Sequence, residues 1–222
     1  SRIVHWPGPR RDIPSVLAAN AGDNFLSWSV CGGLDNAKGK DADCSIVFKY
    51  GMKRDFNAWL ATLGSKAPVK TLTELRQWNV AHQKAGAIKY GQALLDISDE
   101  MEVQADRTRY QADREKDLRL SAAEGIDAVM TQHQLDAILF PAGSGAGIAA
   151  KPGYPTVMVP FGVVPNVSFA GGSSPPPAFP AGFDPKPAPY GVSFTGMACS
   201  EPRLLELAYA FEQATKRRVP PP

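Results

Sequence analysis

The order of apolar and polar residues divides the chain into three stretches. Residues 1–44 follow no sustained period, so we expect them to be irregular. Residues 45–135 repeat apolar side chains at spacings near 3.6, which predicts a mainly helical region. Residues 136–222 hold short apolar runs, a proline-rich loop and one further helical pattern. The pattern therefore predicts helices in the first half of the chain, and strands with a final helix in the second.

The helical region should contain three helices before residue 100. Gly64 is placed to end the first helix. Thr71 can cap the second helix, and Glu74, three residues later, completes a capping box. The third helix should run from about residue 84 to residue 98. The apolar residues of the first helix are Ile46, Val47, Tyr50, Phe56, Trp59, Leu60 and Leu63; Leu75, Trp78 and His82 share one face of the second; Ile88, Leu94 and Leu95 should be buried in the third.

Residues 101–134 are densely charged, with acidic and basic side chains in alternation. Such runs are typical of an exposed helix with ion pairs between residues four apart. We therefore expect this segment to be a solvated helix without a catalytic role.

Three short apolar runs follow, at residues 136–140, 155–161 and 190–194. They are rich in Val and Ile with little alternation, which favours strands buried on both faces. Pro160 lacks an amide hydrogen, so the second strand should end or bulge there. Ser200 should cap the last helix, with Leu204, Ala208, Phe211 and Thr215 facing the core. Helices around buried strands indicate an α/β layered domain.

Composition excludes several classes of protein. The 24 Lys and Arg nearly balance the 22 Asp and Glu, so no nucleic-acid partner is expected. No stretch is long and apolar enough to span a bilayer. Cys31, Cys44 and Cys199 form no CxxC pair, which leaves one possible disulfide among unspecified partners and little basis for a metal site. The chain starts at Ser1 and no basic-then-apolar leader follows, so we expect a processed or cut start. The sequence does not identify the location, and the cytoplasm is favoured.

Candidate nucleophiles can be weighed from their surroundings. Ser173 and Ser174 follow two glycines but run into three prolines, and we interpret them as part of a flexible loop in residues 165–189. His5, His82 and His133 are too dispersed to form a motif. A Ser at the chain start can act as a nucleophile with its own amine as base, so Ser1 remains an alternative.

The loop of residues 141–150 is the most informative feature, because it is made almost entirely of Gly, Ala and Ser between two predicted strands. Small residues let backbone amides approach a bound group closely, and ligands of α/β sheets bind where loops leave the carboxyl ends of strands. Gly143, Gly145 and Gly147 do not match the GxGxxG spacing, so dinucleotide binding is excluded and no cofactor is expected. The loop is predicted to form a wall of a substrate pocket.

Several segments together resemble the C-terminal part of the amidase signature family, which comprises serine hydrolases of amide bonds. They are residues 135–141, 153–162, 189–196 and 200–215, and weaker likeness extends the match to roughly 44–222. The resemblance implies an α/β/α sandwich with a mixed sheet, in which residues 1–222 form the C-terminal part of a single amidase-type domain. The pocket wall it implies comprises Pro141, Ala142, Gly143, Ser144, Gly153 and Tyr154.

The family's catalytic Ser, its second Ser in a cis peptide and its Lys base belong to an N-terminal half that has no match here. No catalytic residue is therefore assigned to this chain. The resemblance implies cleavage of a carbon–nitrogen amide bond through a serine acyl-enzyme, with an N-terminal amidase piece and a small-molecule amide as partners. We expect an apolar contact with that piece above about 2,000 Å². A degenerate, non-catalytic binding or scaffold protein is a further alternative.

Overall fold

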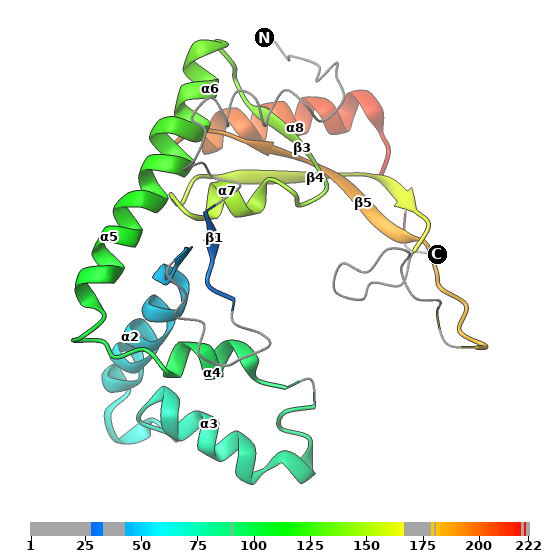
Figure 1. Cartoon of the computed structure of the whole chain (residues 1–222). Coiled ribbons are helices and arrows are strands. Elements are labelled where there is room, and N and C mark those ends of the chain that lie inside the picture. The colour runs from blue at the N-terminus through cyan, green and yellow to red at the C-terminus, as the bar shows by residue number, and fades with distance from the viewer. Residues whose placement is uncertain are drawn as a thin grey trace. The chain divides into compact units, whose positions relative to one another are not determined.

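The computed structural model describes residues 28–32, 43–89, 91–166, 179, 181–218 and 220 (Figure 1). The chain divides into two units, one of residues 13–120 and one of residues 1–12 and 121–222. The predicted residues Ser1, His5, Ser173 and Ser174 lie outside the described residues. The combination of helices and sheet confirms the α/β class expected from the sequence.

The unit of residues 13–120 is mainly helical, as predicted. Its elements are β1 (Ser29–Val30), β2 (Cys44–Ser45), α2 (Val47–Thr62), η1 (Gly64–Lys66), α3 (Leu72–Ala81), η2 (Gln83–Ala85), α4 (Ala93–Asp99) and α5 (Arg107–Leu118). Thr71 caps α3 by accepting a hydrogen bond from the Glu74 amide at 3.1 Å, which confirms the predicted start. The Glu74 carboxylate accepts from the amide of Lys70 at 2.7 Å. This amide lies one residue before the Thr71 amide that a standard capping box uses.

The predicted helix of residues 84–98 is wrong in its first half. Gly86 and Gly91 take left-handed backbone angles, with φ of 89° and 79°, and the regular α-helix α4 begins only at Ala93. Leu94, expected inside, is 53% exposed, and Ile97 is the residue buried at 1%. The two glycines interrupt the helix. The residues that face the interior are therefore set by the new helix that begins at Ala93.

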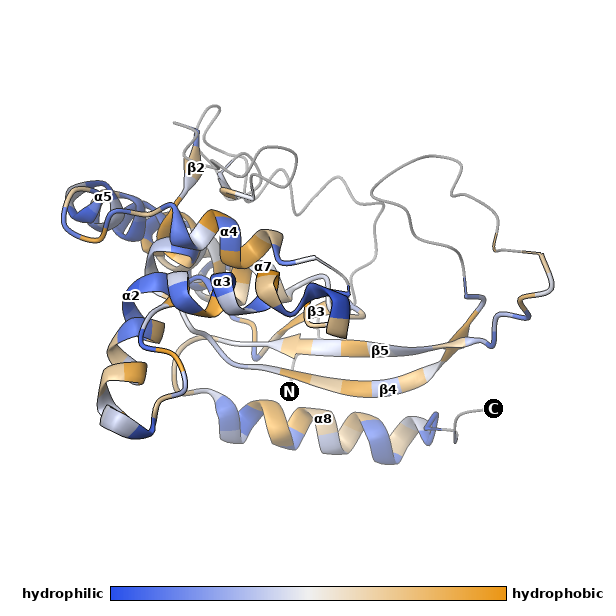
Figure 2. Ribbon diagram, turned by 90° about the horizontal axis from the view of Figure 1, so that it is seen from below, coloured by the Kyte–Doolittle hydropathy of each residue, from blue (hydrophilic) through white to orange (hydrophobic). Residues whose placement is uncertain are grey.

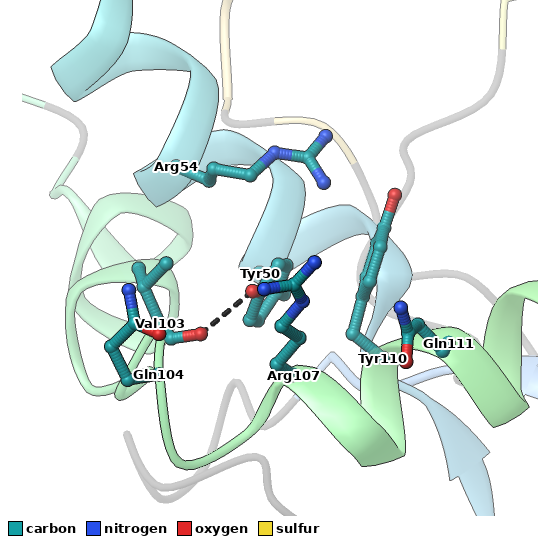
Figure 3. Close-up of a pocket in the computed structure, with 7 residues that line it drawn as sticks. All are labelled: Tyr50, Arg54, Val103, Gln104, Arg107, Tyr110 and Gln111. Carbon is teal, nitrogen blue, oxygen red and sulfur yellow. Dashed lines mark hydrogen bonds between the residues drawn. The ribbon is translucent and has the colours of Figure 1, made fainter.

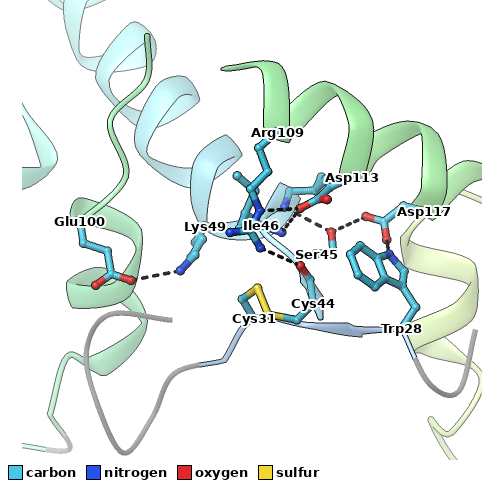
Figure 4. Close-up of a disulfide and its surroundings, with 11 residues drawn as sticks. Trp28, Cys31, Cys44, Ser45, Ile46, Lys49, Glu100, Arg109, Asp113 and Asp117 are labelled. Carbon is cyan, nitrogen blue, oxygen red and sulfur yellow. Dashed lines mark hydrogen bonds and ion pairs between the residues drawn. A yellow bond between two sulfur atoms is a disulfide. The ribbon is translucent and has the colours of Figure 1, made fainter. Parts of the chain in front are cut away.

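A second correction concerns the charged run. Asp113 and Asp117 of α5 are buried, at 8% and 2% exposure, although the sequence predicted a solvated helix. The Asp117 carboxylate accepts from the Trp28 indole at 2.9 Å and from the Ser45 hydroxyl at 2.8 Å (Figure 4). Asp113 accepts from the backbone amide of Ile46 at 3.0 Å. These bonds hold the N-terminal pair of strands against α5.

A disulfide lies beside this network. It joins Cys31 and Cys44, whose Cα atoms are 5.0 Å apart, and so links β1 to β2 (Figure 4). Both cysteines belong to a buried cluster with Ile46, Tyr50 and Met101. Cys199 is free and exposed. Of the alternatives left open by the sequence, the structure therefore selects one pairing.

An ion-pair network joins three helices of the same unit. Asp99 of α4 accepts from the Thr73 hydroxyl at 2.7 Å and pairs with Arg76 of α3 at 2.6 Å and Lys53 of α2 at 3.4 Å. Burial of Asp99 favours its neutral form, but the hydrogen bonds from Thr73 and Arg76 and the charge of Lys53 outweigh this and lower its pKa. Asp99 therefore remains charged.

In the second unit, η3 (Arg119–Ile126), which begins before the unit boundary, is followed by α6 (Asp127–Gln132), α7 (Ala146–Ala150), a sheet and α8 (Glu201–Thr215). The strands are β3 (Ile138–Pro141), β4 (Thr156–Val164) and β5 (Ala188–Thr195), and they pair in the antiparallel order β3-β5-β4. The pairing of β4 with β5 shifts between Pro160 and Gly162. This confirms the predicted bulge at Pro160, which lacks a ladder donor.

Helix α8 covers one face of this sheet (Figure 2). The core between them contains Val159, Phe194, Leu204, Leu207 and Ala208. Leu204 and Ala208 are buried as predicted. The predicted cap at Ser200 is wrong: its hydroxyl accepts no hydrogen bond from the first turn of α8 and donates to the Met197 carbonyl at 2.7 Å.

The prediction that the strands are buried on both faces is wrong for β4. Val159 faces α8 and is 5% exposed, whereas its neighbour Met158 is 52% exposed. Successive strand side chains point to opposite faces, so Met158 lies on the face away from α8.

No described helix is both long and apolar enough to cross a membrane.

Candidate functional site

The predicted pocket loop begins where β3 ends, and β5 holds it in place. The amide of Ala142 donates to the Gly191 carbonyl at 2.8 Å. The Ser193 hydroxyl donates to the Ala142 carbonyl. Ala142 itself takes a left-handed angle, φ 48°, which is unusual for a residue with a side chain. The two contacts from β5 fix this conformation and set the direction of the residues that follow.

Gly143 and Ser144 are exposed in the turn before α7. A Cβ at Gly143 would lie 3.7 Å from the terminal methyl of Met158. Because Met158 occupies the sheet face away from α8, the turn lies over that same face. The turn and the uncovered side of β4 therefore form one surface.

The other predicted residues, Gly153 and Tyr154, follow α7. Gly153 has a φ of 80°, and the amide of Tyr154 donates to the Ala149 carbonyl at 2.9 Å. A helix of five residues is about 7.5 Å long. The six predicted residues thus form two groups at the two ends of α7 rather than one continuous wall.

Tyr154 has a partner that the sequence did not indicate. Its hydroxyl donates to Asp127 of α6 at 2.9 Å. Burial, and then the bond and negative charge of Asp127, raise the pKa of Tyr154. The second carboxylate oxygen of Asp127 is buried and has no hydrogen-bond partner among the described residues. The 27-residue separation of the pair gave no signal in the sequence.

The loop hydroxyls do not form an activated nucleophile. Ser144 donates to the Pro141 carbonyl at 2.8 Å, and Ser193 donates to Ala142. A serine nucleophile needs a base as its hydrogen-bond partner, and both hydroxyls instead bond carbonyl oxygens. The backbone amides of residues 144, 146 and 149 are also used within the loop and α7. The small-residue run thus presents fewer open amides than the sequence suggested.

His82 and His133 are exposed, and His82 stacks on Trp78 with ring centroids 4.0 Å apart. Trp28 is buried, at 6% exposure, and its indole donates to Asp117. Among the described residues, no group of three or more His, Cys, Asp or Glu could hold a metal ion.

A separate cavity of about 320 Å³ lies in the helical unit (Figure 3). No pattern along the chain indicates it, because its lining combines α2 with the segment before α5 and the first turn of α5, about fifty residues away along the chain. Its lining residues are Tyr50, Arg54, Val103, Gln104, Arg107, Tyr110 and Gln111.

The antiparallel sheet, the single helix on one face and the loop that β5 holds define an α/β protein with an amidase-type fold. The chain is 29% identical over 184 residues to a probable amidase of Arabidopsis thaliana, covering 82% of this chain and 31% of that protein. No protein-family model matches it.

Solved structures show the same relationship. The native peptide amidase of Stenotrophomonas maltophilia is 33% identical, with a TM-score of 0.61 over 79% of this chain and 34% of the other. An amidase family protein of Bacillus anthracis shares the fold at 24% identity and a TM-score of 0.61, covering 86% of this chain and 32% of that one. The chain belongs to the amidase signature family and corresponds to the C-terminal part of such a protein. It spans about a third of the length of these relatives.

Proposed function

We propose that this chain is the C-terminal part of an amidase-type hydrolase that cleaves a carbon–nitrogen amide bond through a serine acyl-enzyme. The observation that carries the proposal is the 33% identity to a peptide amidase over 79% of this chain. Because the relatives are about three times longer, the nucleophile, the second Ser and the Lys base would come from an N-terminal piece. A peptide amide is the first substrate to test.

In this proposal the loop at the end of β3 forms part of the substrate-pocket wall. Pro141, Gly143 and Ser144 are exposed, and Ala142 is tied to β5. A loop with a fixed backbone and little side-chain volume can position a substrate without filling its space. Gly153 and Tyr154 would contribute at the other end of α7, where the bond to Asp127 fixes the phenol.

Gly143 gives the sharpest test of this wall. A Cβ there meets only Met158 at ordinary contact distance, so Gly143→Ala should leave amide hydrolysis nearly unchanged. Gly143→Trp would place a large ring over the uncovered sheet face and should lower kcat/KM for a peptide amide by about tenfold or more, by excluding the substrate. The measurement is steady-state hydrolysis by the native assembly purified through this chain.

The control is Gly145→Ala. Its Cβ would overlap the Phe140 ring, so this variant should lower the melting temperature, whereas Gly143→Trp should lower kcat/KM. Full activity of Gly143→Trp would remove the loop from the pocket. Activity that is lost in Ser1→Ala would favour the N-terminal nucleophile. A native assembly inactive on all amides tested would favour a non-catalytic binding or scaffold protein.

A further inference from the structure

The cavity between α2 and the start of α5 has the size and chemistry of a small-molecule site. Its volume of about 320 Å³ is at the lower end of the range of ligand pockets, roughly 300–1,000 Å³. Of the described residues that line it, two are arginines and none is acidic. The catalytic proposal above assigns no role to this cavity.

The two arginines differ in how they are held. Arg54 is bound in a fork by Asp55, with nitrogen–oxygen distances of 2.6 and 3.0 Å. The hydrogen bond that Arg54 donates to Asp55, and next its hydrogen bond with the Tyr110 hydroxyl, raise the pKa of Arg54, which stays charged. Arg107 is exposed at the cavity and has neither an ion pair nor a side-chain hydrogen bond to any described residue. Among the described residues, Asp55 balances Arg54, and Arg107 contributes a second positive charge that no ion pair balances.

The aromatic part of the lining is held in place by stacking and by a hydrogen bond. The rings of Tyr50 and Tyr110 stack with centroids 4.3 Å apart, and the Arg54 guanidinium lies 4.9 Å from the Tyr110 centroid. The hydroxyl of Tyr50 is fixed by its bond to the Val103 carbonyl at 2.7 Å (Figure 3). Arg107 extends toward the same space as these rings (Figure 3). The cavity thus combines preorganised aromatic surface with one available guanidinium.

We propose that this cavity binds a small organic monocarboxylate with a planar apolar body, and that Arg107 receives the carboxylate. The guanidinium fork matches a carboxylate with two parallel hydrogen bonds. A single negative charge neutralises the one surplus positive charge, whereas a phosphate dianion would exceed it. Gln104 and Gln111 supply carboxamide donors at the exposed side of the cavity, and the partly exposed ring of Tyr110, backed by the buried ring of Tyr50, contacts the apolar body. The proposal does not depend on the amidase assignment.

Benzoate is the probe, and the native assembly purified through this chain is the protein used. Benzoate should bind saturably in calorimetric titration. Benzamide, which has nearly the same shape without the charge, should bind at least about tenfold more weakly, since a hydrogen bond to a charged group is lost. Arg107→Gln should weaken benzoate binding by a similar factor, and Arg107→Lys by less. Arg218→Gln removes an equivalent exposed charge outside the cavity and should change nothing.

A second variant covers the case in which Arg107→Gln lowers the melting temperature. Gln111→Glu keeps the side-chain size but adds a negative charge to the lining, and it should also weaken benzoate binding. The proposal is overturned if no saturable binding occurs, if benzamide binds as tightly as benzoate, or if both variants bind benzoate unchanged. Tighter binding of phenyl phosphate than of benzoate would overturn the choice of a carboxylate.

Discussion

At the scale of single residues, buried carboxylates organise the helical unit. Asp113 and Asp117 lie in a run whose composition is typical of a solvated helix, yet both are buried. A carboxylate is stable inside a protein only where donors surround it. The donors to Asp117 come from Trp28 and Ser45, which are 89 and 72 residues away along the chain. No local pattern could have identified them.

The first prediction tests this bond pair. Asp117→Ala leaves the Trp28 indole and the Ser45 hydroxyl without their acceptor, and each lost partner costs roughly 1–3 kcal/mol. We expect the free energy of unfolding to fall by about 2–5 kcal/mol. Chemical denaturation followed by Trp fluorescence measures it. Glu115→Ala, at an exposed site of the same helix, should change it by less than about 0.5 kcal/mol; an equal loss in both variants would contradict the assignment.

At the scale of elements, the sequence located most strands and helices but not their surroundings. The three apolar runs are strands, and Pro160 does create a bulge. The strands pair in antiparallel order, however, and on the face of β4 away from α8 the Met158 side chain is exposed. Runs of Val and Ile are common to strands buried on one or both sides, so composition could not separate the two cases. The helix expected at residues 84–98 was shortened because Gly86 and Gly91 adopt left-handed angles.

The second prediction belongs to the scale of elements and concerns the disulfide between β1 and β2. Cys31 and Cys44 are 13 residues apart, and a bridge closing a loop of that size contributes about 3 kcal/mol in the chain-entropy treatment. The double variant Cys31→Ala, Cys44→Ala should lose about this much free energy of unfolding, measured by urea denaturation. Cys199→Ala, at an exposed free thiol, should lose little. If Cys199→Ala lost as much free energy of unfolding as the double variant, the bridge would not be the source of the stabilisation.

The same bridge bears on where the protein resides. Disulfides persist in oxidising compartments and are rare in the reducing cytosol. The Cys31–Cys44 bond therefore favours an oxidising compartment over the cytoplasm expected from the sequence. Thiol labelling of protein taken directly from its source should modify Cys199 alone if this holds; labelling of all three cysteines would contradict it.

At the scale of the whole molecule, the described part of the sheet unit leaves apolar surface exposed. Helix α8 packs on one face of the sheet, and several apolar side chains of this unit are exposed: Met158, Phe161, Val163, Val164, Phe183 and Met197. Exposed apolar surface and open strand edges favour association with another chain or segment. Under the proposed function, the N-terminal piece of the amidase supplies that cover.

The prediction at this scale is that the isolated chain aggregates. Expressed alone, it should elute as aggregates in size-exclusion chromatography and bind a hydrophobic dye. With an N-terminal amidase piece it should form a soluble complex that buries more than about 2,000 Å². A soluble monomer that unfolds cooperatively without a partner would contradict this prediction.

The sequence by itself determined the α/β class, the capped helix start at Thr71, the bulge at Pro160 and the family resemblance. These depend on neighbouring residues or on short motifs, which propensity and periodicity report. Only the tertiary structure determined the antiparallel order of the strands, the Cys31–Cys44 pairing, the Tyr154–Asp127 bond and the arginine-lined cavity. Each of these joins segments that meet only when the chain folds, so the pattern along the chain carries no record of them.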